Sequence, residues 1–117
     1  MNVVEFEREA RDALVKFPFL KRMEIVDIHR EAIKLRLYAK ENLFVQAYFN
    51  SATGTKNFVA ILSNERIFGR DCDQKGWHRH TFEYPVGHDF SPEGRKEVSI
   101  TEFLEELQEI IEREDLL

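Results

Sequence analysis

Residues 33–49 read IKLRLYAKENLFVQAYF. Apolar side chains occupy every second position on both sides of a short polar turn at residues 40–42. A period of two is typical of strands that place one face against a core and the other toward solvent. The stretch therefore predicts a hairpin of two antiparallel strands, residues 33–39 and 43–49.

Three further strands are expected around this hairpin. Residues 21–28 alternate less regularly before it, and residues 57–62 and 66–70 follow turns rich in Asn, Ser and Gly. Together they predict an antiparallel meander of about five strands. Apolar residues fall on both faces of this sheet, so we expect a helix or loop to cover part of each face.

Two amphipathic helices are expected at the ends of the chain. Asn2 with Glu5, and Ser99 with Glu102, are capping-box pairs that precede apolar residues at helical spacing. They predict helices over about residues 3–16 and 100–113, and Pro18 ends the first. The sequence thus predicts a single α+β domain over residues 1–117, with the sheet between an N-terminal and a C-terminal helix.

Composition supports one core and an uneven charge distribution. The chain has 117 residues, 43% of them hydrophobic, including ten Phe, which is enough to fill one core. Its net charge is -5, yet residues 99–117 alone carry seven acids and one base. The remaining body is close to neutral, which leaves room there for a polyanionic ligand.

Several features bear on where the protein acts. Cys72 is the only cysteine, so no internal disulfide can form. Met1 is followed directly by a charged helical pattern that does not resemble a secretion signal. No apolar run approaches the roughly 20 residues needed to cross a bilayer. We therefore expect a cytoplasmic protein without membrane association.

The segment between Gly69 and Ser99 loses regular periodicity and contains three of the four histidines: His78, His80 and His88. Long irregular segments inside small domains are often functional. If residues 77–82 are extended, His78 and His80 point to one face of the chain and Arg79 to the other. This pairing is the most specific geometric expectation that the sequence offers.

Two neighbouring imidazoles suit metal-independent cleavage of RNA. One group removes the proton of a 2'-hydroxyl and another protonates the leaving oxygen, and imidazole serves both tasks near neutral pH. The guanidinium groups of Arg66 and Arg70 are candidates to stabilise the negative phosphate. In this hypothesis His78 and His80 share the acid and base roles, and no cofactor is needed.

Two other interpretations remain open. A metal centre would use His78 and His80 as ligands, completed by His88, Asp71 or Cys72, although the spacing matches no closed zinc signature. In the other, the histidines are structural and the protein is a non-enzymatic binding module that recognises a partner through strand edges or the acidic helix.

Four short motifs resemble the TumE-like toxin family of type II toxin-antitoxin modules. They are RIFGRD at residues 66–71, GWHRHTFE at residues 76–83, His88, and SITEFL at residues 99–104. The family pattern has RIF-x-x-D, WH-x-HPF, a further His and a terminal SLEEFL helix. The resemblance extends from Ile33 to the C-terminus.

Thr81 stands where that pattern has proline, and residues 72–75 replace its shorter link after the aspartate. The resemblance implies a small toxin with suspected ribonuclease activity, neutralised by a DNA-binding antitoxin, with RNA as a possible substrate and oligomers possible. The matched positions that we expect to be catalytic are Arg66, Asp71, His78, His80 and His88. The neighbouring residues that we expect to contact the substrate are Arg70, Trp77, Arg79 and Tyr84.

Overall fold

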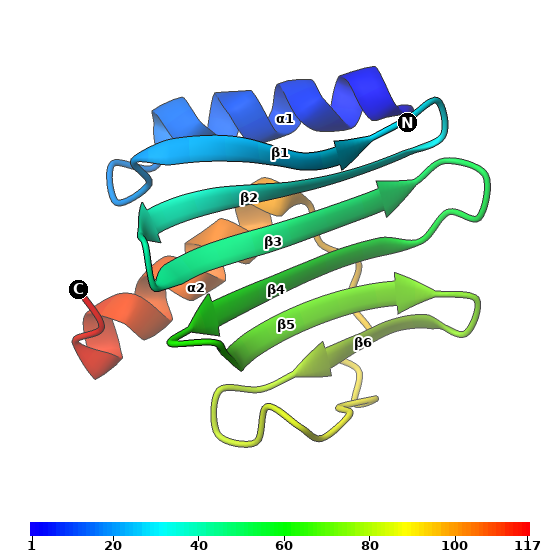
Figure 1. Ribbon diagram of the computed structural model, residues 1–117. Helices are drawn as coiled ribbons and strands as arrows, with labels where there is room; N and C mark the ends of the chain where they lie inside the picture. Colours follow the sequence, from blue (N-terminus) through cyan, green and yellow to red (C-terminus); the bar gives the residue numbers. More distant parts are fainter.

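The computed structural model describes residues 1–117 and contains two helices and one antiparallel sheet (Figure 1). The six strands lie in the order of the chain, β1 to β6, so the sheet is a simple meander. The predicted α+β class is confirmed, with six strands in place of about five. The elements are α1 (Val3–Lys16), β1 (Arg22–Ile28), β2 (Ala32–Lys40), β3 (Leu43–Asn50), β4 (Lys56–Leu62), β5 (Glu65–Asp73), β6 (Gly76–His80) and α2 (Ile100–Glu114).

The additional strand, β6, lies in the segment where sequence periodicity is lost. It forms a hairpin with β5, and the turn ends at Gly76 with a φ of 94° that favours glycine. Strand β6 has no apolar alternation because its two core-side positions are Trp77 and Arg79. The residue types of β6 therefore lack the hydrophobic alternation by which a strand is recognised in a sequence.

Both predicted capping boxes are present. The Asn2 side chain accepts a hydrogen bond from the Glu5 amide at 2.8 Å, and Ser99 Oγ accepts one from the Glu102 amide at 3.1 Å. Each carboxylate accepts a bond from the cap backbone in return. Such caps contribute about 1 kcal/mol each. Neither helix is both long and apolar enough to cross a lipid bilayer.

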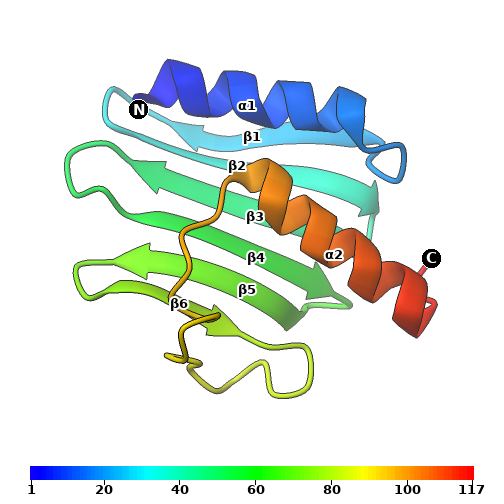
Figure 2. The same ribbon diagram turned by 180° about the vertical axis from the view of Figure 1, so that it is seen from behind.

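Both helices pack on the same face of the sheet (Figure 2). Phe6 of α1 stacks on Phe49 and Phe58, with ring centroids 5.2 and 6.2 Å apart. Phe103 of α2 packs against Phe58 and Phe68 at 5.5 and 5.3 Å. The expectation that the sheet lies between the two helices is therefore wrong.

The opposite face, which we call the open face, is covered by no helix. Its aromatic residues are shielded by their neighbours instead: the Phe44 ring lies 5.1 Å from the buried Tyr38 ring and 4.7 Å from the Arg36 guanidinium. Antiparallel pairing places the side chains of this face in cross-strand rows. One row is Lys34, Tyr48, Asn57, Asp71 and His78, the next is Arg36, Gln46, Val59, Gly69 and His80, and a third includes Tyr38, Phe44, Ile61 and Arg66.

Arg70 links the helix-covered face of β5 to α2 through a hydrogen-bonded ion pair. Its side chain is completely buried, and its guanidinium donates to both carboxylate oxygens of Glu106, at 3.0 and 2.6 Å. A further bond of 2.7 Å reaches the carbonyl oxygen of Glu93 in the segment that follows β6. A buried charge is tolerated only when it is paired and hydrogen-bonded in this way.

We expect Glu106→Ala to lower the free energy of unfolding by about 3 kcal/mol, because the substitution removes the two shortest carboxylate contacts of the buried Arg70 guanidinium and leaves only Glu93 Oε1 at 3.4 Å. Urea denaturation measures this change. Glu105→Ala, at an exposed position of the same helix, is the matched control and should alter stability by less than about 0.5 kcal/mol. If Glu106→Ala also stayed within that margin, the ion pair would not be what holds the sheet to α2.

Candidate functional site

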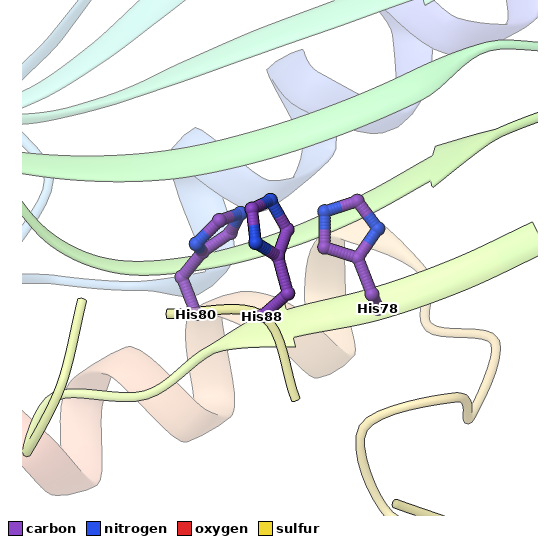
Figure 3. Close-up of side chains that lie close together, drawn as sticks. All are labelled: His78, His80 and His88. Atoms are coloured by element: carbon purple, nitrogen blue, oxygen red, sulfur yellow. The ribbon is translucent and has the colours of Figure 1, made fainter. Parts of the chain in front are cut away.

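Three histidine rings converge on the open face beside β6 (Figure 3). His78 and His80 project from the same side of the strand, as predicted, with ring centroids 5.1 Å apart. His88 lies over them at 5.1 Å from His78 and 4.9 Å from His80. The ligand atoms of the three rings all lie within 4.8 Å of one another.

His88 is brought to this position by the return of the chain along the outer edge of β6. Arg79 and Asp89 exchange backbone hydrogen bonds of 3.1 and 2.8 Å, and their side chains form an ion pair at 2.6 Å. Hydrogen bonds from Ser91, and then from Arg79, lower the pKa of Asp89 to about 2. A Cβ atom at Gly94 would overlap the Asp89 carbonyl oxygen, so this close approach requires glycine.

Asp71 of the neighbouring strand β5 joins the histidine pair. It lies opposite His78 in the β5–β6 register. Its Oδ2 atom is 3.2 Å from Nε2 of His80 and 3.5 Å from Nε2 of His78. The structure thus brings together Asp71, His78, His80 and His88, which the sequence nominated as members of one site.

A hydrogen bond fixes the tautomer of His80, and burial favours its uncharged form. Nδ1 lies 2.9 Å from the Pro85 carbonyl oxygen, so this nitrogen donates and Nε2 is left facing Asp71. The Arg66 Nη1 atom is 3.3 Å from Nε2. Burial, reinforced by the Arg66 charge, lowers the pKa of His80. The ring is therefore held neutral at pH values where a free imidazole begins to protonate.

The pKa of Asp71 is shifted in the opposite direction to that of His80. Burial raises the pKa of Asp71, although His80, His78 and Arg66 all oppose this change. A carboxyl with a raised pKa and an imidazole with a lowered pKa both favour their neutral forms. The geometry therefore suits a proton shared between Asp71 Oδ2 and His80 Nε2.

The four side chains of the cluster differ in their exposure to solvent, and therefore in whether a ligand can contact them. The side chains of His78 and His80 are only 10% and 4% exposed, whereas His88 is exposed and Asp71 is 19% exposed. Neither His78 nor His80 therefore lies in a solvent-reachable hollow. Asp71 and His88 are the members of the cluster that a ligand can reach.

A depression of about 340 Å³ on the open face begins at Asp71. Gly69, at the adjacent open-face position of β5, carries no side chain, and a Cβ there would lie 3.6 Å from His80 Cδ2 and 3.3 Å from the Phe58 carbonyl oxygen. The contact with His80 would be an ordinary one, whereas the contact with the Phe58 carbonyl would be tight, so a side chain here would press on the backbone of β4. The residues lining the depression are Lys34, Gln46, Tyr48, Asn57, Val59, Arg66 and Asp71.

Sequence reasoning nominated Arg66 and Asp71 but missed the other residues of this depression. Lys34, Gln46 and Tyr48 occupy the solvent-side positions of the hairpin at residues 33–49, so their shared face was predictable. Their convergence with Asp71 depends on the register of four strands, which no local pattern specifies.

Three of the four residues nominated for substrate contact lie on the helix-covered side of the sheet, away from the histidines. Arg70 and Arg79 point to the helix-covered side, and Trp77 packs there against Phe58 with ring centroids 6.5 Å apart. Tyr84 is exposed in the loop and shares a small cavity with His88. The positions of Arg70, Arg79 and Trp77 exclude direct contact with a ligand held on the open face.

The histidine cluster could also hold a metal ion after modest closure. In a tetrahedral zinc site, ligand nitrogens at about 2.0 Å from the metal are roughly 3.4 Å apart. The 4.8 Å limit of this cluster is wider. The bond from His80 Nδ1 to the Pro85 carbonyl is an arrangement that metal-ligating histidines commonly use.

Comparison of the chain with protein-family models, curated proteins and solved structures gave no match. The resemblance to TumE-like toxins therefore rests on the four sequence motifs.

Replacing Arg66 by Met should raise the pKa of His80, because the substitution removes a cation that disfavours the imidazolium form. The wild-type midpoint should lie below the usual value near 6.5. An NMR pH titration of the histidine side chains measures both midpoints, with His80 assigned through His80→Asn. A wild-type midpoint at or above the usual value, or no rise in Arg66→Met, would contradict this description of the site.

Proposed function

We propose that the chain is a toxin of a toxin-antitoxin module and acts as a metal-independent endoribonuclease. The observation that supports this proposal is the Asp71 carboxyl, which borders an open depression beside Arg66 and is backed by two buried imidazoles. A positioned proton acceptor next to an unpaired guanidinium is what cleavage of a phosphodiester through its own 2'-hydroxyl requires.

In the proposed reaction, the bond from phosphorus to the 2'-oxygen forms in the same step in which the bond to the 5'-oxygen breaks. Asp71 removes the proton from the 2'-hydroxyl, and the oxygen attacks the adjacent phosphorus while the bond from phosphorus to the 5'-oxygen breaks. The departing 5'-oxygen takes a proton from His88, which leaves a 2',3'-cyclic phosphate and a free 5'-hydroxyl. Arg66 stabilises the negative charge that develops on the phosphate oxygens.

In this proposal His78 and His80 are positioning residues. Both face the same oxygen of Asp71, which leaves the other oxygen of that carboxylate for the substrate. Burial makes Asp71 a stronger base than an exposed aspartate, since its pKa is raised. As the free oxygen of Asp71 takes the proton of the 2'-hydroxyl, the proton on Oδ2 passes to His80 Nε2, 3.2 Å away, so the carboxyl never holds two protons.

The edge strand β1 is the feature best suited to a protein partner. It pairs only with β2, and Ile25, Val26 and Ile28 are 36%, 43% and 48% exposed. An unpaired strand edge with exposed apolar side chains can accept a strand from another chain. We propose this edge as the antitoxin contact, and it equally supports the alternative of a non-enzymatic binding module.

Asp71→Asn should reduce RNA cleavage by 100-fold or more, since an amide cannot accept the hydroxyl proton. The assay is cleavage of labelled RNA in excess EDTA, with detection of the 2',3'-cyclic phosphate product. The same variant should no longer inhibit growth when expressed without an antitoxin. His29→Asn, which alters an exposed histidine in the β1–β2 turn, is the matched control and should remain fully active.

A folded Asp71→Asn protein with full cleavage activity would remove the proposed mechanism. Loss of cleavage in EDTA, with recovery on addition of Zn²⁺, would show that the histidine cluster is a metal centre and would overturn metal independence. A wild-type protein that neither cleaves RNA nor inhibits growth would favour the binding module.

A further inference from the structure

The depression on the open face contains two cations that no carboxylate neutralises. Lys34 and Arg66 line it, and neither forms an ion pair within the protein. The chain as a whole carries a net charge of -5. Asp71 is the only acid of the lining, so its cations outnumber its carboxylates. An excess of positive charge in one hollow of an acidic protein indicates an anionic ligand.

The other lining residues offer groups that recognise a nucleobase. Tyr48 supplies a half-buried aromatic ring, whose hydroxyl accepts a bond of 3.2 Å from Asn50. Gln46 uses its Oε1 atom to accept a bond of 3.1 Å from Arg36, which leaves its amide hydrogens free. Asn57 has no side-chain hydrogen bond within the protein, and Val59 provides an apolar contact. Aromatic stacking and amide hydrogen bonds are the usual means of reading an unpaired base.

The size of the depression limits what it can hold. Its volume of about 340 Å³ is at the small end of the range for ligand pockets, which suits one nucleotide better than a longer segment. A base can enter it only if that base is unpaired, because duplex RNA keeps its bases stacked inside the helix. The ligand that fits is therefore one nucleotide of a single strand.

We infer that this depression is the base and ribose subsite for single-stranded RNA, with the base against Tyr48 and the flanking phosphates at Lys34 and Arg66. The inference rests on the proposed function and deepens it, because it identifies the nucleotide whose 2'-hydroxyl lies at Asp71. Gln46 and Asn57 then determine which base is preferred.

Fluorescence anisotropy with short labelled homopolymer RNAs tests this subsite, using the full-length Asp71→Asn protein so that the RNA stays intact. In that background, we expect Tyr48→Ala to weaken binding about tenfold or more, as loss of one stacked base does. Lys34→Gln should weaken binding and reduce its salt dependence. Asn57→Ala should change the order of preference among the four homopolymers. A hairpin duplex of the same length should bind more weakly than the single strands.

Lys16→Gln removes an equivalent charge from the end of α1, on the helix-covered side, and should leave binding unchanged. Equal affinity of Tyr48→Ala and the parent protein, or stronger binding of duplex than single strand, would overturn the subsite. RNA cleavage by the otherwise wild-type Tyr48→Ala protein at the normal rate and position would do the same while leaving the proposed function intact. Binding that depends on Tyr48 and Lys34 in a chain that never cleaves RNA would support the subsite and refute the nuclease.

Discussion

One-sided burial of the sheet is the constraint on which the rest of the structure depends. Because both helices cover the same face, the alternation of side chains along the strands assigns most residues of β2 to β5 either to the core or to the open face. A register shift between β4 and β5 places Arg66 on the open face, although Phe68 and Arg70, two and four positions later, face the core. Phe58 and Arg70 are cross-strand neighbours on the core side. Asp71 and His78 are paired on the other. The candidate catalytic side chains therefore lie together on the one face that no helix covers.

Much of the fold could be predicted because its signals are local. The alternation in residues 33–49 and the two capping boxes depend on neighbours a few positions apart, and the structure contains all of them. The side of the sheet on which each helix packs is not a local property, so that expectation was wrong. Strand β6 was obscured because Arg79 stands at a core-side position, where its charge is compensated by Asp89 from a later segment.

For the candidate site, as for the fold, local features could be predicted from the sequence and tertiary ones could not. The shared face of His78 and His80 follows from spacing alone, whereas their contact with Asp71 depends on the turn at residues 73–76, which sets the hairpin register. Arg70 differs from Asp71 by one position and therefore lies on the opposite side of the sheet, bound to Glu106. Proximity in sequence made Arg70 a candidate, and strand geometry assigns it to the core instead. Burial of the two imidazoles is a tertiary property, and it shifts the proposed contact with substrate to Asp71.

The most direct test of the account is a crystal structure of the protein with a 2'-O-methyl dinucleotide, which retains the phosphate but cannot be cleaved. We expect the phosphate within hydrogen-bonding distance of Arg66, the methylated oxygen beside Asp71, and the upstream base against Tyr48 on the open face. A dinucleotide bound on the helix-covered side, or along β1 away from Asp71, would contradict it.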